Sequence, residues 1–204
     1  RNTMTESVST QKKNWCVVIG VLILTVGLMI ANYGCAVSMA GALGAMNAAQ
    51  YYVLVSALGS LSMMLVLPVV GRLIGILGLR NLVLLGILIQ AGGRVLMMFS
   101  PSWVPYAIGY FVQGLGGGAY TTAAYIILAI TVPPQETPKF FGFNSVAMSI
   151  GSMLGPILVS AMSAAGGFSA KLAYISHLPF VIIGILMAWK GCPNQRTPGA
   201  GKGF

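Results

Sequence analysis

The sequence predicts an all-α membrane protein, and three observations support this fold class. Only 6% of the 204 residues are charged, whereas soluble domains have about 25%. The hydrophobic fraction is 57% and the mean hydropathy is +0.88. Long apolar stretches also recur along the chain, and a helix needs roughly 20 apolar residues to cross a bilayer core. No alternating barrel pattern is present, so we expect these stretches to be transmembrane helices.

The first three stretches occupy residues 15–39, 51–70 and 81–99. The first follows the polar residues 1–14, and it is too long for the apolar core of a signal peptide, so we interpret it as a retained span. The second ends where a glycine-rich basic segment begins. The third contains Arg94, a single cation within an apolar run.

The last three stretches occupy residues 104–132, 141–165 and 172–189. Trp103 precedes the fourth span and Trp189 ends the sixth, as interfacial tryptophans do in many membrane proteins. Residues 190–204 contain prolines and glycines without an apolar period. We therefore expect three regions, with a cytoplasmic segment at 1–14, a six-helix bundle at 15–189 and a cytoplasmic tail at 190–204.

The positions of the basic residues predict the orientation of the helices. Most of them fall before the first span, between spans 2 and 3, between spans 4 and 5, or after span 6: Lys12, Lys13, Arg72, Arg80, Lys139, Lys190, Arg196 and Lys202. On the other side we find only Lys171. Because cytoplasmic loops are enriched in Lys and Arg, both termini are expected to be cytoplasmic, in a plasma or inner membrane.

Composition also disfavours other functional classes. The formal charge of +9 is scattered singly between apolar runs, so no nucleic-acid partner is expected. The three cysteines show no metal or redox spacing, and the single histidine has no catalytic neighbours in sequence. We predict no enzyme activity, no catalytic residue, no metal site and no cofactor.

Several motifs resemble those of the major facilitator superfamily. The segment with Gly71, Arg72, Gly75, Gly78 and Arg80 is similar to the family's Gly-x-Leu-x-Asp-x-x-Gly-Arg-Arg loop between helices 2 and 3. Gly75 replaces the usual Asp. By resemblance these five residues form a gating loop in the cytosol.

A second motif lies in the fifth span. Gly142, Gly151, Gly155 and Pro156 have the spacing of the family's antiporter signature, Gly-x8-Gly-x3-Gly-Pro-x2-Gly-Gly. Val159 and Ser160 replace its final pair of glycines. Small residues four apart let helices approach closely, and proline loosens the helical ladder, so this segment is expected to act as a hinge. In the fourth span, Gln113 and Gly114 resemble the signature Arg-x-x-Gln-Gly, with Tyr110 in place of Arg.

The resemblance covers essentially the whole chain and matches the amino-terminal six-helix half, nearest to drug–proton antiporters. It implies two three-helix repeats of inverted topology, with helices 1, 2, 4 and 5 lining a cavity. The predicted cavity residues on those helices are mostly polar: Asn32, Tyr33, Tyr110, Gln113, Tyr120, Thr121, Asn144, Met148 and Ser152. The expected partners are the lipid bilayer, a small-molecule solute and a second six-helix half.

The chain lacks the acids expected for proton coupling. Glu6 and Glu136 both fall in predicted cytoplasmic segments, and Asn32 replaces an Asp that many relatives carry. Arg94 either contacts an anionic substrate, or it extends to the outer interface or binds backbone carbonyls. Three arrangements therefore stay open: coupling groups in a missing carboxyl-terminal half, an uncoupled facilitator, or a homodimer of half-transporters.

The predicted function is a secondary carrier that moves a small organic solute by alternating access, with drug or metabolite efflux as one form. The uncharged cavity with tyrosines, methionines and amides favours an amphipathic or neutral solute. The alternative is a non-transporting six-helix scaffold or partner-binding module, which the loss of charge at Gly75, Tyr110 and Asn32 motivates.

Overall fold

The computed structural model describes residues 14–164 and 178–189. Within these ranges the chain forms α-helices and one short 3-10 helix, and they contain no strand. The elements are α1 (Trp15–Ala45), η1 (Ala49–Tyr51), α2 (Tyr52–Leu77), α3 (Leu79–Met98), α4 (Trp103–Thr131), α5 (Thr137–Ala164) and α7 (Leu178–Trp189). The predicted all-α membrane fold is confirmed, because α1 to α5 are each long and apolar enough to cross a membrane.

The sixth predicted span is described from Leu178 onward, as the 12-residue helix α7. The predicted stretch at 172–177, the terminal segments at 1–13 and 190–204, and His177 lie outside the described residues. The limits of the three predicted regions therefore stay predictions.

Helices α1 and α2 extend well past their predicted ends. Helix α1 continues to Ala45 rather than ending at residue 39, and it stops just before Asn47, which has a positive φ of 52°. Helix α2 continues through Pro68 to Leu77 rather than ending at residue 70. The predicted ends of α1 and α2 were too early. Apolar and small residues continue to favour a helix beyond the roughly 20 residues that cross a bilayer core.

The gating segment is consequently helical rather than a loop. Gly71, Arg72 and Gly75 belong to α2, and Arg80 belongs to α3. Only Gly78 separates the two helices, with φ 82° and ψ 153°, a region of backbone space that glycine alone occupies without strain. The turn between α2 and α3 thus depends on one glycine.

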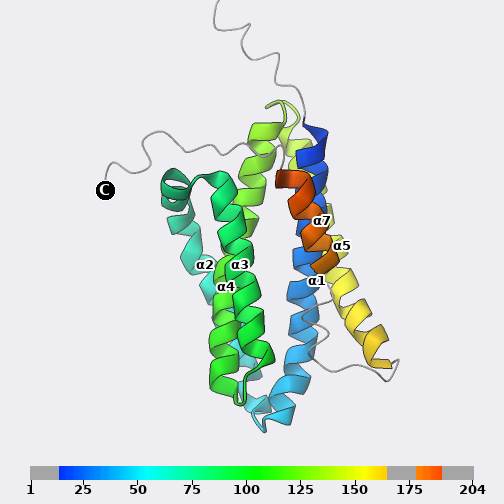
Figure 1. Ribbon diagram of the computed structural model, residues 1–204. Helices are drawn as coiled ribbons and strands as arrows, with labels where there is room; N and C mark the ends of the chain where they lie inside the picture. Colours follow the sequence, from blue (N-terminus) through cyan, green and yellow to red (C-terminus); the bar gives the residue numbers. More distant parts are fainter. Residues whose placement is uncertain (1–13, 165–177, 190–204) are drawn as a thin grey trace, which may run out of the picture.

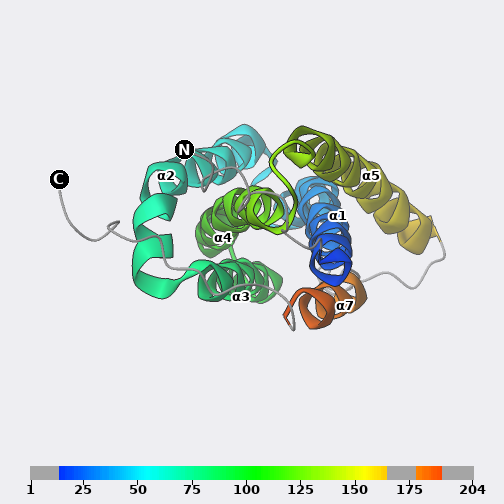
Figure 2. The same cartoon turned by 90° about the horizontal axis from the view of Figure 1, so that it is seen from above.

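The helices run alternately up and down the bundle (Figure 1). The start of α1, the α2–α3 turn, the α4–α5 connection and the end of α7 lie at one end. The α1–α2 and α3–α4 connections lie at the other. Seen from above, α1 and α4 occupy the centre, α2 and α5 flank one side, and α3 and α7 flank the other (Figure 2).

The packing partners repeat in a symmetrical pattern. Helix α1 packs most extensively on α5 and α7, and α4 packs most extensively on α2 and α3. Exchanging α1 with α4, α2 with α5 and α3 with α7 leaves this pattern unchanged. Such an exchange is what two three-helix repeats produce, so the packing agrees with the half-transporter architecture that the resemblance implies.

Glycines bring α3 and α4 into backbone contact. A Cβ atom on Gly93 would lie 2.5 Å from the Gly109 carbonyl oxygen, and one on Gly86 would lie 3.0 Å from the Gly116 carbonyl oxygen. Since backbone atoms cannot yield, only glycine allows this approach. Two apolar clusters fill the bundle, one toward the end with the start of α1 and one toward the opposite end.

Candidate functional site

A cavity of about 330 Å³ lies between α1, α2, α4 and α5. Two of these helices come from each three-helix repeat. The lining residues are mostly small or apolar, with a few amides and hydroxyls: Met29, Asn32, Tyr33, Ala36, Ser56, Gly59, Ser60, Met63, Tyr110, Gln113, Gly114, Gly117 and Met148. A concave, largely apolar space with few polar groups has the character of a small-molecule site.

Five of the nine predicted cavity residues line this space. They are Asn32 and Tyr33 on α1, Tyr110 and Gln113 on α4, and Met148 on α5. Tyr33 is 48% exposed, so it stands at the open side of the cavity, whereas Gln113 is only 5% exposed and lies deep in the wall.

The other four predicted residues lie away from this cavity. Thr121 donates a hydrogen bond of 2.8 Å to the Gly117 carbonyl on its own helix. Ser152 does the same with Ser149, at 2.8 Å. Tyr120 and Asn144 are buried in a separate polar cluster. The helical spacing that grouped them with the cavity residues ignores the rotation of each helix relative to its neighbours.

A cluster of amides and one guanidinium lies at the deep wall of the cavity. The Asn32 Oδ1 atom accepts three hydrogen bonds, from Gln90 Nε2 at 2.9 Å, Gln113 Nε2 at 3.1 Å and Arg94 Nη2 at 3.1 Å. These residues come from α1, α3 and α4. We call them the Asn32 cluster. Gln90 was missed in the sequence, although a glutamine within an apolar span already signals an interior position.

The structure corrects one interpretation of Arg94. Its side chain does not extend to the outer interface, because it is only 3% exposed and bonded to Asn32 inside the bundle. Cys35 of α1 also lies beside it. Arg94 is absent from the cavity lining, whereas its hydrogen-bond partner Asn32 belongs to it.

A second polar cluster joins α1, α4 and α5. The Thr25 hydroxyl donates to Asn144 Oδ1 at 3.0 Å and lies 2.9 Å from the Tyr120 hydroxyl. Tyr120 also donates to the Val21 carbonyl at 3.2 Å. All three side chains are at most 2% exposed. Their arrangement fits a structural tie between helices.

The glycines of the fifth-span motif differ in their surroundings. A Cβ atom on Gly155 would lie 2.7 Å from the Ile30 carbonyl oxygen of α1, and one on Gly151 would lie 2.6 Å from the Val26 carbonyl oxygen. A Cβ atom on Gly142 would meet nothing within 4 Å. Pro156 lies inside α5. Only part of the motif, therefore, forms the α1–α5 crossing.

No group of three or more potential metal ligands occurs among the described residues. The arrangement offers hydrogen bonds and apolar contacts to a solute.

The family model of the Major Facilitator Superfamily matches residues 14–203 of this chain. The chain belongs to the major facilitator superfamily. This membership identifies it as an integral membrane protein of a transporter family rather than an enzyme, and it agrees with the motifs, the apolar helices and the paired packing.

Named relatives include proteins of drug resistance. Over 196 residues the chain is 28% identical to the "Putative multidrug resistance protein MdtD" of Pectobacterium atrosepticum, covering 94% of this chain and 40% of that protein. It is 30% identical over 136 residues to the "Multi-drug resistance efflux pump PmrA homolog" of Lactococcus lactis, covering 67% of this chain and 33% of that protein. The "MFS transporter L2" of a Phoma species is 26% identical over 59% of this chain and 20% of its own length. The chain thus spans 40% or less of the length of each of these relatives.

Proposed function

We propose that this chain is the amino-terminal half of a secondary transporter that moves a small organic solute by alternating access. The observation that carries the proposal is the cavity, which is lined by two helices from each repeat. A space formed between two repeats changes its access when one repeat rocks against the other. The names of the relatives favour efflux of drug-like compounds as the direction and substrate type.

The solute is proposed to be amphipathic or neutral. Three methionines, Met29, Met63 and Met148, line the cavity, and their flexible thioethers adapt to apolar surfaces of varied shape. Glu136 is the one acidic residue in the described ranges, and it lies in the α4–α5 connection rather than in a span. A carboxylate that could carry a coupling proton is therefore proposed to come from another part of the transporter.

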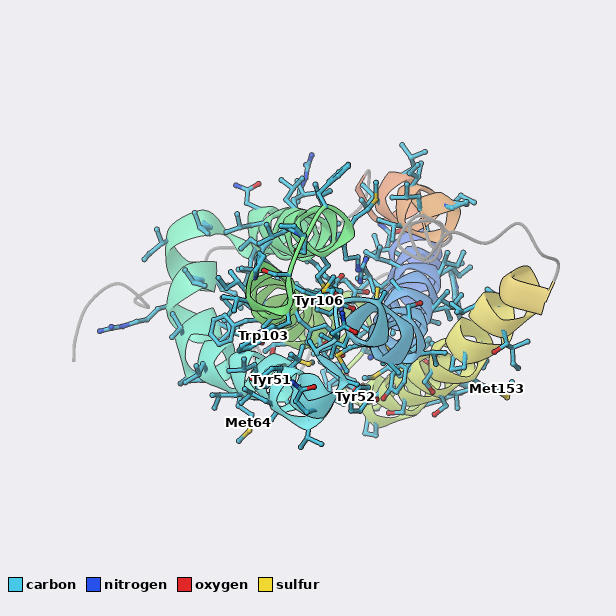
Figure 3. The ribbon with its side chains drawn as sticks, turned by 90° about the horizontal axis from the view of Figure 1, so that it is seen from below. Tyr51, Tyr52, Met64, Trp103, Tyr106 and Met153 are labelled. Carbon is cyan, nitrogen blue, oxygen red and sulfur yellow. The ribbon has the colours of Figure 1, made fainter. Side chains whose placement is uncertain are left out.

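A second six-helix unit is proposed to cover the open side of the cavity. The flanking helices α2 and α5 expose many large apolar side chains, including Met64 at 67% and Met153 at 59%. Both methionines point away from the bundle (Figure 3). The unit is either a carboxyl-terminal half or a second copy of this chain. Both termini are proposed to be cytoplasmic, with residues 1–14 and 190–204 flanking the bundle.

A flux measurement tests the function. The full chain is reconstituted in proteoliposomes, alone and with the second six-helix half of a relative, and uptake of 4-methylumbelliferyl glucoside is followed by fluorescence. This probe is neutral, amphipathic and poorly permeant. We expect saturable uptake above that of protein-free vesicles.

The matched variant is Gln113→Leu, which removes one of the three donors that hold Asn32 Oδ1 at the cavity wall. It should lower uptake at least about tenfold, equivalent to about 1.4 kcal/mol. Uptake no greater than in protein-free vesicles under both conditions would instead favour the non-transporting scaffold.

A further inference from the structure

The orientation of the Asn32 carboxamide is fixed by its neighbour Arg94. A guanidinium only donates hydrogen bonds, so the Asn32 atom 3.1 Å from Arg94 Nη2 must be the carbonyl oxygen. Gln90 and Gln113 approach the same oxygen, and they must therefore present their amide N–H groups to it. One buried cation thus sets the direction of three carboxamides.

This direction leaves a donor at the cavity wall. The Asn32 oxygen is saturated by three donors, while its Nδ2 group makes no hydrogen bond within the described part of the chain. Asn32 lines the cavity. Its unpartnered Nδ2 atom is not among the buried side-chain atoms that lack a hydrogen-bond partner, so this nitrogen is accessible. The polar group that Asn32 offers to a solute is therefore an N–H pair.

The acceptors of the cluster are withdrawn from the cavity. The Oε1 atoms of Gln90 and Gln113 are enclosed by protein and have no hydrogen-bond partner, and the two residues are 1% and 5% exposed. Gln113 itself belongs to the wall. The surface that a solute meets at this point is thus rich in donors and poor in acceptors.

The positive charge of the buried Arg94 also favours a negatively charged or hydrogen-bond-accepting solute. Arg94 is positive, and no acidic residue occurs in the described helices α1 to α4 or within the cavity lining. In a medium of low dielectric constant, a fixed cation attracts negative charge and repels positive charge more strongly than in water. Hydrogen bonding and charge therefore both oppose a cationic solute.

We propose that the cavity selects amphipathic solutes whose polar end accepts hydrogen bonds, a carboxylate ahead of a carboxamide, and rejects ammonium compounds. Asn32 donates hydrogen bonds to the solute, and Arg94 fixes the orientation of the Asn32 carboxamide. The methionines contact the apolar body. This selectivity depends on the proposed function in one respect, namely that the solute binds in the cavity.

Three probes with one apolar body test the selectivity: 1-naphthylacetate, 1-naphthylacetamide and 1-(1-naphthyl)ethylamine, which is an ammonium ion at neutral pH. Their binding to the full chain in nanodiscs is measured by titration calorimetry, with empty nanodiscs as the blank. We expect the carboxylate to bind tightest, the carboxamide next, and the ammonium at least about tenfold more weakly than the carboxylate. Equal or tighter binding of the ammonium, or no binding of any probe, would overturn the proposal.

The substitution Asn32→Asp replaces the decisive donor by an acceptor and adds one negative charge at the cavity wall. An aspartate keeps the oxygen that receives the three protein donors, and it replaces the N–H pair by an acceptor oxygen. We expect the carboxylate to lose at least about tenfold in affinity and the preference to shift toward the ammonium probe. A folded Asn32→Asp protein with the wild-type preference would overturn the proposal.

Two further variants separate polarity from folding. Arg94→Lys keeps a donor-only cation, so it should keep the order of the three probes even if all affinities fall. Tyr33→Phe removes a hydroxyl from the same cavity without touching the Asn32 cluster, and it should keep the order as well. A reversed order in either folded variant would contradict the role given to Asn32.

The two proposals fail separately. Saturable glucoside uptake without binding of any naphthyl probe would overturn the selectivity and leave the transport function standing. Binding of the carboxylate ahead of the ammonium, without uptake in proteoliposomes, would support the selectivity and count against transport.

Discussion

Single polar side chains join helices that are otherwise held by apolar contacts and close packing. Asn32 receives donors from α3 and α4, and Tyr120 of α4 contacts Thr25 and the Val21 carbonyl of α1. An interhelical hydrogen bond within a membrane protein contributes only about 0.6 kcal/mol on average, so each bond is modest. Their joint effect is to fix the rotation of the helices, which apolar contacts alone specify loosely.

The substitution Tyr120→Phe should lower stability by about 0.5–1.5 kcal/mol, because it removes the hydroxyl contacts and keeps the ring. The measurement is denaturant unfolding of the purified protein in detergent. Tyr125→Phe is the matched control on the same helix, since the Tyr125 hydroxyl reaches only the weak acceptor Met148 Sδ, at 3.6 Å. Equal losses in the two variants would show that Tyr120 makes no tie of its own.

Helices α4 and α5 show how glycine placement sets the packing of elements. Helix α4 contacts α3 through Gly109 and Gly116, and it contacts α2 through Gly114. Glycines on two faces let one helix approach two neighbours at backbone distance. On α5, Gly151 and Gly155 do this toward α1 alone. The central position of α1 and α4 follows from these crossings.

Gly155→Ala should force α5 away from α1, because the added Cβ would lie 2.7 Å and 2.9 Å from backbone atoms of Ile30 and Gly34. Overpacking of this kind costs about 1–3 kcal/mol, and transport should fall while membrane insertion is retained. The readouts are unfolding in detergent, uptake in proteoliposomes and the yield of membrane-inserted protein.

Gly142→Ala is the control within the same motif, since its Cβ would enter open space. We expect it to keep uptake and stability close to those of the unmodified chain. If the two alanines reduced uptake equally, the α1–α5 crossing would not be the feature that matters.

At the scale of the whole molecule, the two ends of the bundle differ in charge. Arg72, Arg80 and Lys139 belong to the end that contains the α2–α3 turn and the α4–α5 connection (Figure 1). In the described ranges, the opposite connections carry no basic residue. This asymmetry predicts that the basic end faces the cytoplasm.

Single cysteines test this orientation. The background has Cys16, Cys35 and Cys192 replaced by alanine. In it, Gln50→Cys and Gln135→Cys place exposed thiols at opposite ends of the bundle. On intact cells a membrane-impermeant maleimide should label Gln50→Cys and spare Gln135→Cys, and permeabilised cells should label both. Labelling in the reverse order would place the basic end outside.

The sequence alone determined the fold class, because apolar stretches longer than a bilayer width have few alternatives to a transmembrane helix. It also gave the family resemblance through motifs with fixed spacing, such as Gly151, Gly155 and Pro156, and it placed Asn32, Tyr33, Tyr110, Gln113 and Met148 on the helices that surround the cavity. These features are local in the chain, so a linear pattern records them.

Only the tertiary structure decided how those polar residues pair. Arg94 points to Asn32 rather than to the interface, and Tyr120 and Asn144 meet Thr25 rather than the cavity. Helix ends such as Leu77 likewise lie beyond the end of the apolar stretch that the sequence predicts as the span. The direction of a side chain depends on the rotation of its helix against its neighbours. That rotation is set by contacts between residues far apart in sequence, such as Gly93 with Gly109.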